Sequence, residues 1–326
     1  MKFIIYFLAI LFLSNNGIAF DSNLASQYRK TYRKIRSINY SIDQEQLKKY
    51  KIFIITGFSN KLIPQILDVM RIPAPWLPKD SGDSFLQQKR FFDKAGIDYI
   101  DVPINTLEGC DDNAKIIAHE LEKTNKKVIF LSYSKGGLDV LETLVKYPQL
   151  HNKIAGWISM HTPFYGTPLI DTVLSTPPLN YLFKFLVNRP IFNGNSKVFS
   201  CMSRKARIQY YSDNDIAIDT IRKKIPSLLV GGWKTSWSSK EKKSILAPII
   251  VIIDKVFQFG KNDGFIPTSS MCLAKFNCFS LSNMDHASPV MDVPAFYSIT
   301  ESRRINYTRS LIKMLIKNLT SNSLVR

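Results

Sequence analysis

Short apolar runs alternate with amphipathic segments along most of the chain. Residues 128–131 are uniformly apolar, which is typical of a strand buried on both faces. Residues 136–146 place leucine and valine at helical spacing and end just before Pro148, which predicts an amphipathic helix. Further strands are expected at 51–55, 98–104, 154–160, 227–230 and 276–281, and further helices within 23–49 and at 84–95, 113–123 and 305–319. This alternation predicts an α/β fold with a mostly parallel central sheet flanked by helices.

The alternation stops between residues 169 and 224. This stretch holds Pro177-Pro178, an apolar run over 181–187 and a basic cluster of Arg204, Lys205 and Arg207. We interpret it as a helical cap inserted into a single domain that spans residues 20–326. Residues 244–257 fit a strand by their β-branched side chains and a helix by their length and even apolar character, and a helix is our prediction.

Residues 1–19 have the pattern of a secretory signal peptide. Lys2 is followed by an apolar run over 3–13, by polar residues and by the small Ala19. An uncleaved membrane anchor is the alternative, but the apolar run is only about half of the roughly 20 residues that cross a bilayer. We therefore expect an exported protein, periplasmic or extracellular after cleavage.

The chain is strongly basic, with 44 lysines and arginines against 26 acidic residues and a formal net charge of +18. Such a charge predicts attraction to anionic membrane surfaces or other polyanions, although a compositional bias of the whole proteome would give the same number. No basic strip interleaved with aromatic residues and no nucleic-acid-binding motif is found, so nucleic acid is not an expected partner.

The four cysteines form an even set in a chain expected to be exported, which permits two disulfides. They are Cys110, Cys201, Cys272 and Cys278, and they allow three pairings. Cys272 with Cys278 is the first choice because they would close a small loop. Free buried thiols are the alternative, since a chain of this size does not depend on disulfides.

The sharpest chemical signal is Ser132-Tyr133-Ser134-Lys135-Gly136, which lies between the apolar strand and the amphipathic helix. Serine becomes a nucleophile when a base removes its proton and its oxygen stands clear of the fold. A tight strand-to-helix turn exposes the oxygen but needs small residues two positions before and after the serine. Ser132 and Gly136 meet this need. The start of the helix directs free N–H groups toward developing negative charge, so the Lys135 N–H is a predicted oxyanion-hole donor.

Together with its surroundings this turn resembles the α/β-hydrolases, and among them the bacterial lipases and esterases, whose motif is Gly-x-Ser-x-Gly. Here Ser132 replaces the first glycine. Residues 262–267, Asn-Asp-Gly-Phe-Ile-Pro, are similar to the lipase loop that carries the acid of the catalytic triad, which implies Asp263 in that role. A simple turn is the alternative reading of this segment. Asp285 and Asp254 are the alternative acids.

Only four histidines compete for the role of base. His119 lies in a predicted helix and His151 just after one, whereas His161 ends a predicted strand at the same sheet edge as Ser134 and is a true rival. The resemblance decides between them. The family order is serine, acid, histidine, and His286 alone follows Asp263.

Two further segments extend the resemblance. Family members carry His-Gly after the first central strand; here Thr56-Gly57 keeps the glycine, and the Phe58 N–H is implied as the second oxyanion-hole donor. A structural turn is an equally good reading of Thr-Gly. Residues 161–168 are similar to a lipase segment that follows the sixth strand and carries no catalytic group.

The resemblance implies hydrolysis of a carboxylic ester by Ser134, Asp263 and His286 through an acyl-enzyme, with no metal or cofactor. The apolar run over 181–187 suggests a pocket for a lipid or another hydrophobic acyl ester, and ordinary packing within the cap is the alternative. Three other functions remain open: an acyltransferase, a depolymerase of polyesters such as polyhydroxyalkanoate, and a non-catalytic binding protein of the cell envelope.

Overall fold

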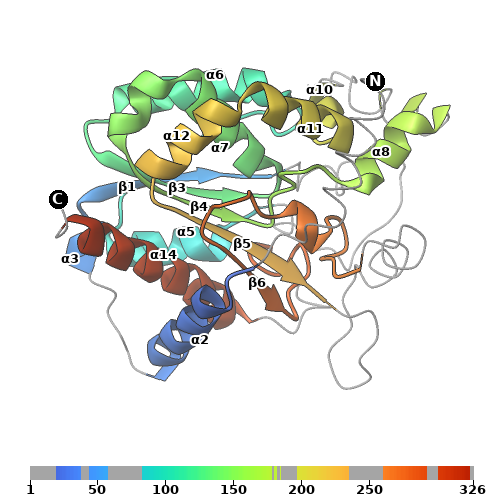
Figure 1. The fold of residues 1–326 in the computed structure, drawn as a ribbon. Coiled ribbons are helices and arrows are strands. Elements are labelled where there is room, and N and C mark those ends of the chain that lie inside the picture. Colours follow the sequence, from blue (N-terminus) through green and yellow to red (C-terminus); the bar gives the residue numbers. More distant parts are fainter. Residues whose placement is uncertain are drawn as a thin grey trace, which may run out of the picture.

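A parallel sheet forms the centre of the described part of the molecule (Figure 1). The computed structural model describes residues 20–37, 44–57, 83–177, 180–181, 184, 197–234, 260–291 and 300–323. In these residues the sheet has six strands in the order β2-β1-β3-β4-β5-β6, and each neighbouring pair is parallel. They are β1 (Tyr50–Ile55), β2 (Tyr99–Asp101), β3 (Lys127–Tyr133), β4 (Ile154–Met160), β5 (Ser227–Trp233) and β6 (Cys278–Ser282). The carboxyl ends of all six strands therefore lie at one edge of the sheet.

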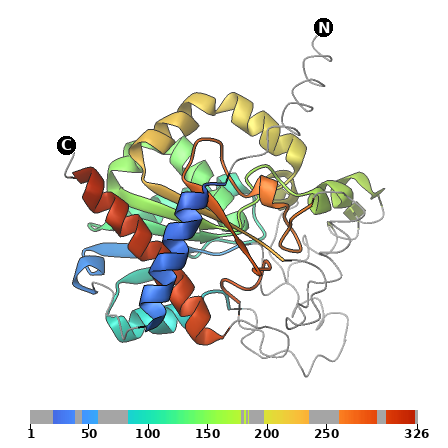
Figure 2. The ribbon, with the colours of Figure 1, turned by 60° about the horizontal axis from the view of Figure 1, so that its bottom comes forward.

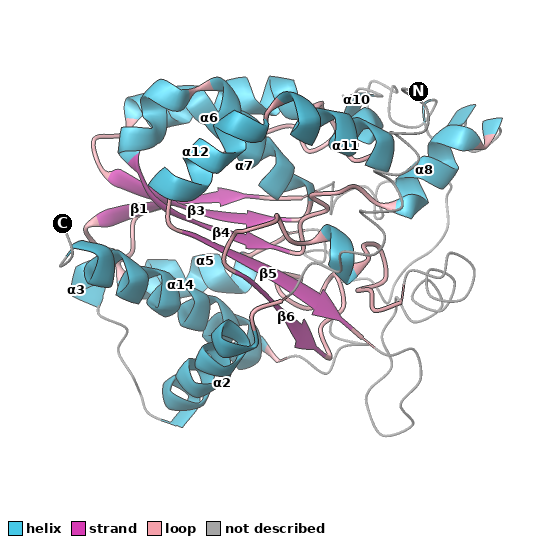
Figure 3. Cartoon of the chain, viewed as in Figure 1, coloured by secondary structure: helices cyan, strands magenta, loops and turns pink. Residues whose placement is uncertain are grey.

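Helices cover both faces of this sheet, as Figure 3 shows by secondary structure. One layer holds α6 (Cys110–Lys123), α7 (Lys135–Lys146), α11 (Arg204–Asp213) and α12 (Asp215–Lys224), and the other holds α2 (Ser22–Ser37), α5 (Leu86–Ala95) and α14 (Glu301–Ser323). A short helix, α3 (Gln44–Leu47), leads into β1. The predicted α/β fold with a mostly parallel sheet between helices is confirmed.

The two faces of the sheet bury two separate apolar cores. Phe53 and Phe130 point toward α6 and α7, whereas their neighbours Ile54 and Ile129 point toward α5 and α14. Successive side chains of a strand face opposite sides, so a strand that is apolar throughout serves both cores. This explains why the central strands are continuous apolar runs.

The segment between β4 and β5, which includes the predicted cap at 169–224, is partly described. It forms α8 (Pro168–Ser175), α10 (Lys197–Ser200), α11 and α12, and α12 packs beside α7 before the chain enters β5. Of the basic cluster, Arg207 is buried: its Nε donates to the Phe164 carbonyl oxygen at 3.0 Å, and its guanidinium lies over the ring of Tyr210. That this segment caps the site stays a prediction.

Several predictions fall outside the described residues: the signal peptide, Phe58, most of 181–187, and the helix at 244–257, which includes Asp254. Among the helices that are described, none combines the length and apolar character needed to cross a bilayer.

Two disulfides are present, the number that the four cysteines permit. Cys110 at the start of α6 is joined to Cys201 just after α10, with Cα atoms 6.1 Å apart, and Cys272 is joined to Cys278 at the start of β6, with Cα atoms 5.9 Å apart. The predicted pairing of Cys272 with Cys278 is confirmed, and the alternative of free thiols is wrong.

Candidate active site

Ser134 occupies a sharp turn at the carboxyl edge of the sheet, between β3 and α7. Its backbone has φ 53° and ψ −130°, a conformation that costs a residue with a side chain about 1–3 kcal/mol. Its N–H donates to the Met160 carbonyl oxygen of the next strand at 2.9 Å, which fixes the turn against β4. The strain is therefore held by the surrounding sheet, and it lifts the hydroxyl out of the strand.

Small neighbours make this turn possible. A Cβ on Gly136 would overlap the carbonyl oxygens of Ile55 and Thr56, and a Cβ on Gly57 would lie 2.5 Å from Ser134 Cβ. Ser132 stands where the Gly-x-Ser-x-Gly motif has its first glycine, and its buried hydroxyl is paired, because Oγ accepts from Trp157 Nε1 at 2.9 Å and donates to a carbonyl oxygen of β4. The tight turn is thus compatible with serine at this position.

The three predicted catalytic side chains meet at this edge. His286 Nε2 lies 3.0 Å from Ser134 Oγ, and His286 Nδ1 lies 2.7 Å from Asp263 Oδ2. Asp263 is fully buried and Ser134 nearly so, whereas 13% of the His286 side chain is exposed. The structure therefore brings a hydroxyl, an imidazole and a carboxylate into one hydrogen-bonded series that solvent reaches at the histidine.

Asp263 is held from two sides. Its Oδ1 accepts from the backbone N–H groups of Phe265 and Ile266 at 3.0 and 2.8 Å, and its Oδ2 accepts from His161 Nδ1 as well as from His286. Burial acts to raise the pKa of Asp263, but the charge of His286 and the hydrogen bonds from both histidines outweigh it, and the pKa of this carboxyl lies well below its usual range. The group is therefore a carboxylate at neutral pH.

The main chain of His286 is fixed as firmly as its ring. Its N–H donates to the Asp263 carbonyl oxygen at 2.8 Å, and its carbonyl oxygen accepts from the Tyr133 hydroxyl at 2.5 Å. The imidazole lies against the rings of Tyr133 and Phe265, with centroids 5.1 and 5.2 Å away. The residue directly before Ser134 thus holds the loop that carries His286, a contact that the sequence analysis missed.

The remaining histidines have other partners. His161 meets Asp263 at 2.8 Å, His119 is exposed on α6, and the ring of His151 meets the Leu144 carbonyl oxygen at 2.7 Å. Of the alternative acids, Asp285 binds the N–H and hydroxyl of Ser288 within its own turn. Among the described residues, His286 is the histidine within hydrogen-bonding distance of Ser134.

Lys135 begins α7 directly after Ser134, so its N–H is one of the first-turn donors that a helix leaves without an internal partner. The position of its side chain is not predictable from the sequence. The ammonium is fully buried and donates to both carboxylate oxygens of Asp139 at 2.8 and 3.0 Å, while the Asn113 amide donates to the same carboxylate at 3.0 Å. Burial raises the pKa of Asp139 to about 6, although Lys135 and Asn113 act to lower it.

His161, Asp263 and His286 are also the one group in the described part of the chain whose side chains could hold a metal ion, with ligand atoms within 4.8 Å of one another. The separations of Nδ1 and Oδ2, 2.7 and 2.8 Å, are those of charge-assisted hydrogen bonds. Their geometry fits a proton relay, and the absence of a metal from the reaction stays a prediction.

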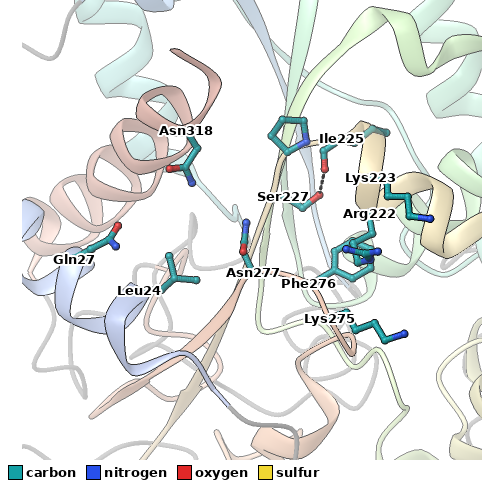
Figure 4. Close-up of a pocket in the computed structure, with 11 residues that line it drawn as sticks. Leu24, Gln27, Arg222, Lys223, Ile225, Ser227, Lys275, Phe276, Asn277 and Asn318 are labelled. Atoms are coloured by element: carbon teal, nitrogen blue, oxygen red, sulfur yellow. Dashed lines mark hydrogen bonds between the residues drawn. The ribbon is translucent and has the colours of Figure 1, made fainter. Parts of the chain in front are cut away.

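A polar cleft of about 390 Å³ lies at the opposite edge of the sheet, where β5 and β6 begin (Figure 4). Gln27 of α2 and Asn318 of α14 line one side, and Arg222, Lys223 and Lys275 line the other. Asp219 already binds both Arg222 and Lys223. Because Ser227 starts β5 whereas Ser134 follows the end of β3, this cleft is separate from the candidate active site.

No protein-family model matches the sequence, and no curated protein matches it. Solved structures do match the fold. A carboxyl esterase from a metagenome superposes with a TM-score of 0.65 at 19% sequence identity, over 83% of this chain and 76% of the esterase. The lipase of Staphylococcus hyicus superposes with a TM-score of 0.55 at 13% sequence identity, over 84% of this chain and 97% of the lipase. The mature form of a Bacillus licheniformis lipase superposes with a TM-score of 0.51 at 20% sequence identity, over 73% of this chain and 85% of the lipase. The chain therefore has the α/β-hydrolase fold, and the solved structures that it resembles include a carboxyl esterase and two bacterial lipases.

Proposed function

We propose that this protein is a serine hydrolase of carboxylic esters, with Ser134 as nucleophile, His286 as general base and Asp263 as the acid that orients it. The observation that carries the proposal is the unbroken hydrogen-bonded series from Ser134 Oγ through His286 to Asp263. The series stands at the strained turn that lifts the Ser134 hydroxyl out of the strand, on a fold whose solved relatives include esterases and lipases. The fold alone would not carry the proposal, because one fold serves many chemistries.

The reaction follows from the positions of these groups. Ser134 Oγ attacks the ester carbonyl carbon while His286 Nε2 takes the hydroxyl proton, and the carbonyl oxygen becomes an oxyanion. The N–H of Lys135, with that of Phe58 as the second donor, stabilises this oxyanion. His286 then returns the proton to the leaving alcohol, and a water molecule activated by the same histidine releases the acid and restores Ser134.

The substrate proposed is a lipid or another hydrophobic ester, with the segment over 181–187 contributing to the acyl pocket, and the site of action is the periplasm or the cell exterior. Support for the substrate comes from the apolar character of that segment and from the lipases among the similar structures. Support for export comes from the pattern of residues 1–19 and from two disulfides, which persist in oxidising compartments.

The test of the nucleophile is Ser134→Ala. Ser302→Ala is the matched control, because it makes the same change at an exposed position of α14, away from the candidate site. Ser134→Ala should lose on the order of 10⁶ in kcat toward short-chain p-nitrophenyl esters and should lose labelling by a fluorophosphonate probe, whereas the control keeps both. Labelling that persists in Ser134→Ala would contradict the assignment. A wild-type protein that is neither labelled nor active would favour the non-catalytic binding protein.

Product analysis separates the remaining alternatives. With an acceptor alcohol present, a hydrolase releases mainly free acid, whereas an acyltransferase releases mainly the new ester. Release of hydroxy acids from a polyhydroxyalkanoate film, at a rate above that on lipid esters, would favour the depolymerase.

We propose in addition that α2 mediates peripheral association with anionic membranes. Arg29, Lys30, Arg33, Lys34 and Arg36 are all exposed, and α2 contains no acidic residue. Its buried side chains, Leu24, Ala25, Tyr28 and Ile35, face the opposite direction because successive residues of a helix turn by about 100°. Figure 2 shows α2 crossing α14 on the outside of the molecule.

Each cation near an anionic surface contributes about 1 kcal/mol to binding. Replacing Arg29, Lys30 and Arg33 by glutamate should therefore weaken co-sedimentation with phosphatidylserine vesicles by about a hundredfold or more. The matched control replaces Lys94, Lys205 and Lys275, which are exposed outside α2, by glutamate and thus has the same net charge. Equal weakening in both variants would mean that net charge, and not α2, governs the association.

A further inference from the structure

His161 contacts the catalytic acid but has no part in the proton relay. It directly follows β4, its backbone has φ 52°, and its side chain is fully buried. Its Nδ1 lies 2.8 Å from Asp263 Oδ2, the same oxygen that meets His286 Nδ1 at 2.7 Å. Two imidazoles therefore share one carboxylate oxygen: His161 follows β4, His286 follows β6, and Asp263 follows β5, the strand between them.

The surroundings of His161 decide its protonation state. Its Nε2 is buried and has no hydrogen-bond partner among the described residues. Gly232 of β5 packs against this part of the ring, because a Cβ there would overlap Cε1 and lie 2.5 Å from Nε2. A charged imidazolium would bury a second N–H without an acceptor, which costs about 1–3 kcal/mol or more. The neutral ring with its proton on Nδ1 avoids that cost and supplies the donor that Asp263 meets.

We propose that His161 is a positioning residue: a neutral imidazole whose Nδ1–H locks the Asp263 carboxylate and draws part of its negative charge away from His286. The inference rests on the proposed ester hydrolysis and adds a fourth side chain to its machinery. With His161 in place, Asp263 accepts hydrogen bonds from His161, His286 and two backbone N–H groups, so neither oxygen can turn away.

Loss of this donor has two consequences. The carboxylate gains freedom to rotate, and His286 then spends less time aligned with Ser134, which lowers kcat and leaves KM nearly unchanged. Without the hydrogen bond from His161, the negative charge of the Asp263 carboxylate also acts more strongly on His286. This stronger attraction stabilises the imidazolium form of His286. The base is then inactivated by protonation at a higher pH, so the acidic limb of the kcat/KM profile moves upward.

The described groups that can influence this limb are few. Ser134, Tyr133, Asp263 and His161 face His286, and the nearby Asp285 is turned toward Ser288. Since phenols ordinarily ionise near about pH 10 and serine hydroxyls higher still, a change in the limb reports on Asp263 and its two histidines.

The experiment compares His161→Asn with His161→Leu, which have similar branched side chains. Asn carries an N–H on the atom that corresponds to Nδ1 and tolerates positive φ; Leu has no donor. His161→Leu should lose about tenfold to a hundredfold in kcat and move the acidic limb upward by roughly half a pH unit, and His161→Asn should recover most of kcat and restore the limb. Ser159→Ala, which removes a buried hydroxyl of β4 beside Thr162, is the control for local disturbance and should leave the limb in place.

A limb that stays in place in His161→Leu, or moves equally in both variants, would overturn the proposal. The wild-type protein gives an independent measurement if His161→Leu does not fold. In ¹⁵N-histidine NMR at pH 7, His161 should carry its proton on Nδ1 and none on Nε2; a protonated Nε2 would equally overturn the proposal. Because this measurement needs no turnover, a failure of the proposed ester hydrolysis is recognised separately, by the Ser134→Ala and labelling experiment.

Discussion

The buried ion pair of Lys135 and Asp139 permits a sharp test of how burial and attraction balance behind the nucleophile. Both side chains are fully buried, and the ammonium lies 2.8 and 3.0 Å from the two carboxylate oxygens. The pKa of Asp139 is nevertheless raised to about 6, which means that the cost of burying the carboxylate exceeds its attraction to Lys135. We expect Lys135→Met with Asp139→Leu, which fills the space with apolar atoms, to match or exceed the wild type in free energy of unfolding at pH 7.

The pH dependence of the free energy of unfolding shows how large the effect of burying Asp139 is and in which direction it acts. A carboxyl whose pKa is higher in the folded than in the unfolded protein binds its proton first in the folded state, so stability falls as the pH rises between the two values. With an unfolded pKa near 3.9 and a folded pKa of about 6, the free energy of unfolding of the wild type should fall by about 2 kcal/mol between pH 4 and pH 6 relative to the double variant. Lys135→Met alone leaves the carboxylate buried without its partner and should cost about 3–5 kcal/mol at pH 7, and less at pH 4.

Urea unfolding followed by circular dichroism at pH 4, 5, 6 and 7 measures these differences. A free energy of unfolding that rises with pH in the wild type, relative to the double variant, would refute the reasoning, because attraction to Lys135 would then outweigh burial. The fluorophosphonate labelling rate reports in the same samples whether the turn at Ser134 depends on the pair.

Three further predictions follow from the fold and the site. Gly57→Ala should lower kcat by about a hundredfold, because its Cβ would lie 2.5 Å from Ser134 Cβ and displace the hydroxyl, and a crystal structure of the variant would show the shift. Replacing Cys110 and Cys201 by serine should lower the free energy of unfolding by about 4.6 kcal/mol, and replacing Cys272 and Cys278 should lower it by about 2.2 kcal/mol, because the two disulfides close loops with sequence separations of 91 and 6. Equal losses of stability in thermal unfolding would argue against loop entropy as the cause. The pKa of Asp263 is lowered, so its contribution to the free energy of unfolding is present above about pH 4 and is lost on further acidification. Between pH 4 and pH 2.5, Asp263→Asn should therefore lose less of its free energy of unfolding than the wild type in the same assay.

The parts of the fold that the sequence predicts are those set by local pattern. Apolar runs identify the central strands because both faces of a parallel sheet are buried, and the small residues around Ser134 identify the turn because its backbone crowds its neighbours. The edge strand is predicted less well: residues 98–104 are expected to be extended, but β2 ends at Asp101. Pro103 has no N–H to donate, and β1 is the one strand that pairs with β2 in the described part of the chain, so pairing ends early.

Contacts between distant residues are the part that the sequence does not predict. His161 and Asp263 are 102 residues apart and meet because β4 and β5 are neighbours, and the Tyr133 hydroxyl reaches the carbonyl oxygen of His286, 153 residues away. The pattern placed His161 at the right sheet edge but could not say which side of Asp263 it occupies. The inward side chain of Lys135 is equally hidden, since a lysine in a first helical turn is ordinarily exposed.

The covalent link between Cys110 and Cys201 encloses β3, α7, β4 and α8 within one loop of the chain. A protease that cuts anywhere inside this loop produces two pieces that remain attached to each other. Nicked protein would migrate as intact chain on a non-reducing gel, and Ser134, inside the loop, would stay joined to Asp263 and His286, outside it. Maturation or damage by a single cleavage in this region would thus be visible only after a reductant is added.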